Sequence, residues 1–131
     1  MAQPTLVLLL PDDPLTGLLT LSSLASYGYD TLLASSIPEA EGFLEANRRV
    51  GALVVNADIP GGCGLVLAKA GRALNPKLAV VYTSRMPQRI PEREKVPGAP
   101  CLRAPYHPHQ LVKIVGQLTG RLASDEDARV A

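Results

Sequence analysis

Polar residues that could do chemistry stand just after apolar runs in this chain. Asp12 and Asp13 follow the first run, Asn56 and Asp58 follow a run in the middle, and Thr83 closes a later one. The carboxylates can hold a cation or accept hydrogen bonds, and the hydroxyl can donate to an anion. The amide of Asn56 carries no charge and is a poor nucleophile. At that residue the side chain therefore offers hydrogen bonding rather than covalent chemistry.

Short apolar runs alternate with amphipathic segments, which indicates strands alternating with helices. We expect strands over residues 5–10, 31–34, 52–55, 78–82 and 99–103, and helices over 14–27, 38–47, 64–74 and 108–122. Asp13 and Ser36 are predicted to cap the first two helices, and the helical spacing of Leu15, Leu18 and Leu24 predicts that they face the core.

The segment 85–97 is different because its prolines, at 87, 91 and 97, exclude a long regular helix. Only a short helix around 92–96 is expected there. At the start of the last helix, His107 and His109 flank a proline, and their spacing favours capping and surface roles over a metal site.

Alternating strands and helices imply a parallel sheet with right-handed crossovers. Five such units fit a flavodoxin-like three-layer α/β/α sandwich with strand order 2-1-3-4-5 and a short or irregular fourth helix. We expect one domain over residues 1–123 and a disordered tail over 124–131, which has no apolar period. In such a sheet the carboxyl ends of the strands form one edge, where ligands bind, and the polar residues named above should gather there.

Composition narrows the classes of function. The 131 residues are 47% hydrophobic and 19% charged, with a net charge of +1, so no basic surface for nucleic acid is expected. The first apolar run is too short to cross a bilayer, and no signal peptide is recognisable. We therefore expect a cytoplasmic protein without nucleic-acid or membrane partners, and its two cysteines should be reduced.

Several short motifs carry a resemblance to a known family. They are Pro-Asp-Asp-Pro-Leu at 11–15, Tyr-Gly-Tyr at 27–29, Ile-Pro-Gly-Gly-Cys-Gly-Leu at 59–65, Val-Val-Tyr-Thr-Ser at 80–84 and Leu-Arg-Ala-Pro-Tyr-His-Pro-His-Gln-Leu at 102–111. In this order and spacing they make the chain resemble bacterial response-regulator receiver (CheY-like) domains over nearly its full length. In these domains an aspartate after the third strand accepts a phosphoryl group, and an acidic pair after the first strand helps hold magnesium. A hydroxyl after the fourth strand and a lysine after the fifth contact the phosphoryl group.

The resemblance implies that this site is degenerate. The acceptor position is Asn56, the hydroxyl is Thr83, and the lysine position holds Ala104, followed by Pro105. The acidic pair becomes Pro11 and Asp12. Sliding the register by one residue would restore the pair as Asp12 and Asp13, but it would spoil the match at Pro14 and Gly28.

Loss of these groups implies no resident cofactor. We expect at most weak magnesium binding, through Asp12, the Asn56 amide oxygen and Asp58. Asp58 is weighed as a displaced acceptor, although a solvated loop aspartate is the simpler interpretation. Thr83 is either a relic of the site or a polar switch that moves when a partner binds.

The favoured function is a phosphorylation-independent protein–protein interaction module of two-component signalling, and not an enzyme. The implied partner is another signalling protein, such as a histidine kinase or regulator, or a second copy in a homodimer. The residues expected on the partner surface are Cys101, Arg103, Tyr106, Lys113 and Gln117.

Two alternatives stay open. The first is a phosphorelay domain that uses another acceptor or competes for a histidine kinase. The second is a small-molecule-binding flavodoxin-like domain, for which Tyr82 and Tyr106 are the only aromatic residues expected near the ligand edge.

Overall fold

The computed structural model describes residues 5–11, 13–47 and 49–120. Five parallel strands form one sheet in the order β2-β1-β3-β4-β5, as predicted. The strands are β1 (Leu6–Leu10), β2 (Asp30–Leu33), β3 (Val50–Asn56), β4 (Ala79–Ser84) and β5 (Cys101–Arg103). The α-helices are α1 (Pro14–Ser26), α2 (Ile37–Ala46), α3 (Cys63–Leu74) and α4 (Pro108–Thr119).

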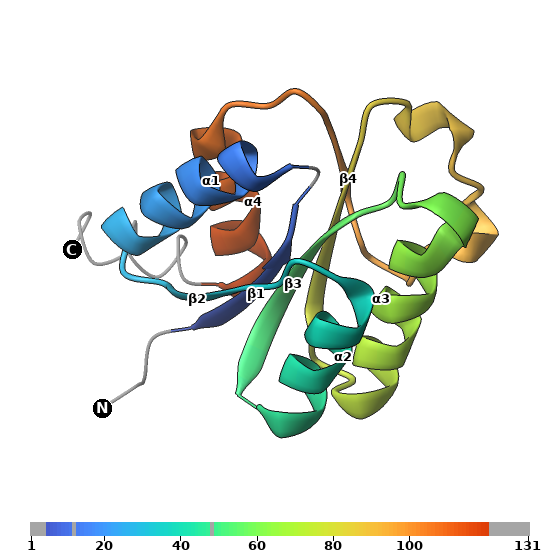
Figure 1. Ribbon diagram of the computed structural model, residues 1–131, viewed down its shortest axis with the longest axis horizontal. Helices are drawn as coiled ribbons and strands as arrows, with labels where there is room; N and C mark the ends of the chain where they lie inside the picture. The colour runs from blue at the N-terminus through green and yellow to red at the C-terminus, as the bar shows by residue number, and fades with distance from the viewer. Residues whose placement is uncertain (1–4, 12, 48, 121–131) are drawn as a thin grey trace.

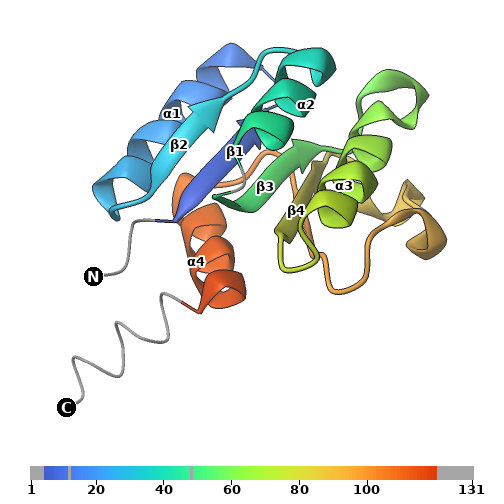
Figure 2. The same ribbon diagram turned by 90° about the horizontal axis from the view of Figure 1, so that it is seen from below.

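The helices cover both faces of the sheet, which gives three layers (Figure 1 and Figure 2). Helices α1 and α4 pack together on one face, and α2 and α3 on the other. Alternate residues of β1 and β3 enter the two cores, so that Leu8 and Leu53 face α2 and α3 whereas Val7 and Val54 face α1 and α4. Because both faces are covered, the central strands are apolar throughout, as the sequence predicted.

Local capping follows the expected chemistry. The Asp13 carboxylate accepts a hydrogen bond from the Thr16 backbone N–H at 2.8 Å, and Ser36 accepts one from the Glu39 N–H at 3.2 Å. His107 Nδ1 accepts from the His109 N–H at 3.1 Å and caps α4. These side chains satisfy backbone donors that have no partner within their helices, and they fix where the helices begin.

The predicted buried face of α1 is wrong in part. Leu24 is buried, but Leu15 and Leu18 are 67% and 57% exposed, and Gly17 and Thr20 face the core instead. Helix α1 lies so close to the sheet and to the loop after β1 that a Cβ at Gly17 would stand 3.2 Å from the Leu33 side chain of β2 and 2.7 Å from the Pro11 ring. Small residues therefore occupy this contact. Leucine recurs all around the helix, so leucine spacing could not identify the face.

The segment between β4 and β5 contains no α-helix. Two short 3₁₀ turns, Pro87–Arg89 (η2) and Glu92–Glu94 (η3), replace the short helix expected around 92–96. Three prolines remove backbone donors here, which prevents a longer helical ladder. Among the residues that the structure describes, no helix is long and apolar enough to cross a membrane.

Candidate functional site

The predicted strand-end residues meet at the carboxyl edge of the sheet. Asn56 and Thr83 are register partners on β3 and β4, and the Ala57 N–H donates to the Thr83 carbonyl at 2.8 Å. On the next strand, the Ala104 N–H donates to the Ser84 carbonyl at 2.8 Å, and the Ala104–Pro105 peptide is cis. The sheet therefore brings Asn56, Thr83 and Ala104 to one edge, as the resemblance implied.

The Asn56 side chain closes the loop that follows β3. Its Oδ1 accepts a hydrogen bond from the Asp58 backbone N–H at 2.9 Å, an Asx turn two residues long. Helix α3 begins immediately beyond this loop, and a Cβ at Gly64 would lie 2.4 Å from the Asn56 carbonyl oxygen. Asn56 is thus part of a tightly packed turn and acts as a hydrogen-bond acceptor there.

Asp58 is an exposed residue of the loop after β3, in keeping with the simpler interpretation, and its carboxylate is also hydrogen-bonded to the neighbouring strand end. Its Oδ1 accepts from the Ser84 hydroxyl at 2.6 Å, and its Oδ2 accepts from the Arg85 backbone N–H at 2.8 Å. Ser84 Oγ in turn accepts from the Met86 N–H at 3.0 Å. The Ser84 hydroxyl therefore accepts one hydrogen bond, from Met86, and donates its proton to the Asp58 carboxylate. These bonds join the loop after β3 to the loop after β4.

Asp13 lies beside a pocket of about 280 Å³ that also involves Thr16, Arg85, Ala104 and Tyr106. The pKa of Asp13 is lowered, chiefly by the hydrogen bond from the Thr16 backbone N–H and then by the Thr16 hydroxyl. The nearby positive charge of Arg85 lowers it further. Asp13 is therefore ionised at neutral pH and serves the helix start. Asp12 lies outside the described residues.

The described residues fit magnesium poorly. Of the three predicted ligands, Asn56 is uncharged and its oxygen already accepts a hydrogen bond, and the Asp58 carboxylate is directed to Ser84 and Arg85. Over residues 5–11, 13–47 and 49–120, no three His, Cys, Asp or Glu side chains form a metal-binding group. Magnesium prefers several hard oxygen ligands with carboxylates among them, which this arrangement does not offer.

The predicted partner-surface residues separate into two regions. Cys101 and Gln117 line a groove of about 1050 Å³ at the β5 edge. Tyr106 lies by the smaller pocket, with its hydroxyl 3.3 Å from the Thr20 hydroxyl. Arg103 is exposed and donates to the Gln88 side chain at 3.3 Å, and Lys113 is exposed on α4.

Sequence reasoning did not identify Ser84 or Arg85 as parts of the site. The resemblance assigned the hydroxyl of the site to Thr83, and it gave Ser84 and Arg85 no role. Tyr82, which we had placed near the ligand edge, is wholly buried, and its hydroxyl accepts from the Val96 N–H at 3.0 Å. Of the two tyrosines expected there, Tyr106 is therefore the one that a ligand at that edge could stack on.

Several solved structures with a similar fold are response-regulator receiver domains. A receiver protein from Sinorhizobium medicae WSM419 is 23% identical, with a TM-score of 0.76 over 89% of this chain and 95% of that one. A CheY-like receiver from Methanospirillum hungatei JF-1 is 20% identical, with a TM-score of 0.75 over 93% and 99%. The receiver domain of the hybrid histidine kinase CckA is 23% identical, with a TM-score of 0.74 over 87% and 98%.

No protein-family model matches the chain, and no curated protein matches it significantly. At this level of identity the structural likeness shows the fold. The predicted receiver-like fold is confirmed, including the strand order and the irregular segment in place of a helix before β5.

Proposed function

We propose that this chain is a two-component-type signalling domain that acts through protein–protein contacts and is not itself phosphorylated. The structural likeness to receiver domains supports the signalling class. The observation that carries the second part is the replacement of the acceptor by Asn56, together with the use of its amide oxygen in the turn to Asp58. The domain is then a binding module and not an enzyme.

The bonds around Asp58 support phosphorylation independence in a second way. In phosphoryl transfer the protein must neutralise charge on the phosphoryl oxygens. Here the lysine position is Ala104, which carries no charge, and the Asp58 carboxylate already accepts hydrogen bonds from Ser84 and Arg85. The loop after β4 is therefore held by the protein's own carboxylate, without an added group.

A small phosphodonor tests the proposal directly. The chain is incubated with acetyl phosphate and magnesium, and its intact mass is measured. We expect no stable gain of a phosphoryl group. The matched control is the double variant Asn56→Asp with Ala104→Lys, which restores a nucleophile and a cation, and which we expect to gain one. A stable phosphoryl group on Asp58 or Asp13 of the unaltered chain would refute the proposal.

A second candidate function is competition for a histidine kinase, docking without accepting its phosphoryl group. Helix α1 supports it because Leu15, Leu18 and Leu19, at helical spacing beside the strand-end site, are 67%, 57% and 55% exposed. A leucine stripe next to the site suits a helical partner. The test is phosphotransfer between a kinase and a receiver of the same organism. We expect the chain to inhibit transfer and Leu18→Glu to abolish the inhibition, with Glu41→Lys on α2 as the control. Inhibition that is absent, or that Leu18→Glu leaves unchanged, would exclude this candidate.

A further inference from the structure

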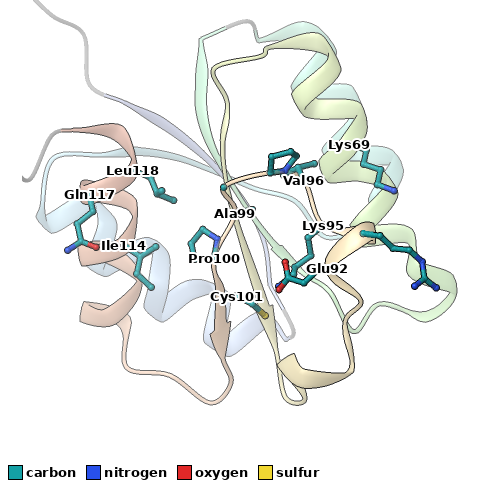
Figure 3. A pocket seen from close by; sticks show the side chains of 13 residues that line it. Lys69, Glu92, Lys95, Val96, Ala99, Pro100, Cys101, Ile114, Gln117 and Leu118 are labelled. Carbon is teal, nitrogen blue, oxygen red and sulfur yellow. The ribbon is translucent and has the colours of Figure 1, made fainter.

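A groove of about 1050 Å³ opens beside the start of β5, which is the edge strand of the sheet (Figure 3). Its two walls belong to elements on opposite faces of that sheet. Helix α4 forms one wall through Ile114, Gln117 and Leu118, and α3 with the η3 segment forms the other. Residues 99–101 lie between the walls. An occupant of the groove therefore lies next to the edge strand and contacts both walls.

The wall opposite α4 is held in place by the protein itself. Arg72 donates from Nε to the Leu78 carbonyl and from its terminal nitrogen to the Pro97 carbonyl, both at 3.0 Å. The buried Tyr82 hydroxyl accepts from the Val96 N–H at 3.0 Å. These three bonds hold the segment before β5 against α3 and the sheet, so that a ligand enters a preformed groove.

The outer edge of β5 offers backbone hydrogen-bonding groups. The Pro100 carbonyl accepts a hydrogen bond from β4 at 2.9 Å, and the Ala104 N–H donates one to β4 at 2.8 Å. Backbone groups of alternate residues point to alternate sides of a parallel strand, so those of Cys101 and Arg103 point away from β4. None of the residues that the structure describes bonds to these outward groups. They are free to pair with an added strand.

The wall formed by α3 and η3 carries an excess of positive charge. Lys95 is paired with Glu92 at 3.0 Å, so these two charges offset one another. Lys69 and Arg93 are exposed, and neither forms an ion pair within the described part of the chain. A second copy paired edge to edge would bring the same cations together, which costs free energy. Charge therefore favours an acidic partner over a second copy of this chain.

The two walls also set a side-chain pattern for an added strand. Successive side chains of a strand point to opposite faces of the sheet. Every second side chain then meets Lys69 and Arg93, and those between meet Ile114 and Leu118 on α4. Leu118 is 39% exposed and provides an open apolar surface. The complementary sequence alternates carboxylates with apolar side chains.

We propose that this groove binds an extended acidic segment of a partner protein, which adds to β5 as a sixth strand of the sheet. The outward N–H and C=O groups of Cys101 and Arg103 supply main-chain hydrogen bonds, and the two walls select the alternating side chains. The inference rests on the proposed function, in which the domain acts through protein contacts, and it states the chemistry of one partner.

A short synthetic peptide of alternating glutamate and valine is the probe, and its binding is measured by NMR titration of the protein. One control peptide has the same composition with all glutamates before all valines, which removes the alternation. The other alternates lysine with valine, which reverses the charge. We expect the alternating acidic peptide to bind about tenfold more tightly than either control.

Hydrogen exchange of individual amides locates the bound peptide. At a peptide concentration of about ten times Kd, exchange of the Cys101 and Arg103 amides should slow by about tenfold, because the bound strand covers them. The Leu102 amide lies between them on the side of β4, and its exchange should change little.

A charge reversal tests the basic wall. Lys69→Glu with Arg93→Glu should reverse the preference, so that the lysine–valine peptide binds more tightly than the glutamate–valine peptide. The matched control is Arg49→Glu with Lys77→Glu, which changes two exposed cations that do not line the groove and should leave the preference unaltered.

Four results would overturn the proposal. They are absence of binding, equal binding of the three peptides, unchanged exchange at Cys101 and Arg103, and a charge reversal that leaves the preference as it was. Protection of these two amides that grows with protein concentration in the absence of peptide would also overturn it, because it would place a second copy at this edge. None of these measurements depends on whether the chain accepts a phosphoryl group, so failure here is distinguishable from failure of the proposed function.

Discussion

Removing the Asp58 carboxylate and the Ser84 hydroxyl, singly and together, tests whether the two strand-end loops are joined. The Ser84 hydroxyl donates to Asp58 at 2.6 Å and lies in a fully buried residue, whereas Asp58 is itself exposed. We expect Ser84→Ala to lower the free energy of unfolding by about 1–3 kcal/mol, because it leaves the carboxylate and the Met86 N–H without their partner. We expect Asp58→Ala to lower the free energy of unfolding by about 1–2 kcal/mol. This loss is small for a charged acceptor because Asp58 is exposed and solvent screens its charge.

The double variant should lose less than the sum of the two single losses. Both substitutions remove the same hydrogen bond, so we expect a coupling energy of about 1 kcal/mol between them. The chain has no tryptophan, and helix content by circular dichroism in urea is therefore the suitable signal. Glu41→Ala, which removes an exposed carboxylate on α2, is the control for loss of charge. Additive losses, with unchanged dependence on urea, would show that the Asp58–Ser84 bond is absent in solution and would refute our account of the site.

Three further outcomes follow from the packing and the titrating groups. Gly64→Ala should destabilise the fold by about 1–3 kcal/mol in urea, since a Cβ there would stand 2.4 Å from a carbonyl oxygen, and unchanged stability would contradict the close approach of α3. Burial raises the pKa of Tyr82 above its ordinary 10.0, so its contribution to stability is present below pH 10 and is lost as pH rises through the folded pKa. When the free energy of unfolding is measured as a function of pH, it should fall less above pH 10 in the Tyr82→Phe variant than in the unaltered protein. The pKa of Asp13 is lowered from 3.8, chiefly by the Thr16 N–H, so its stabilisation holds above that value and is lost as pH falls through the folded pKa. The Asp13→Asn variant should therefore lose less stability at acid pH than the unaltered protein. An identical loss in the two proteins would show that the Asp13 carboxylate does not cap α1.

The amino-acid sequence alone determined the architecture. Continuous apolar runs such as that of β1 predict buried parallel strands, and the alternation with amphipathic segments predicts the crossovers, because these are local patterns with fixed periods. Capping by Asp13 and Ser36 was predictable for the same reason, since the donors they satisfy lie within three residues. The placement of Asn56 and Ala104 at the strand ends was also predictable, because it depends on which residues follow the apolar runs.

Tertiary structure alone decided what the remaining side chains do. The pairing of Asp58 with Ser84 joins residues 26 apart in the chain, and only the register of β3 and β4 brings them together. The buried face of α1 was set by how closely the helix approaches the sheet, which selects Gly17 and leaves Leu15 and Leu18 exposed. The groove beside β5 likewise depends on where two 3₁₀ turns are held by Arg72 and Tyr82. Such contacts are non-local, and no periodicity along the chain encodes them.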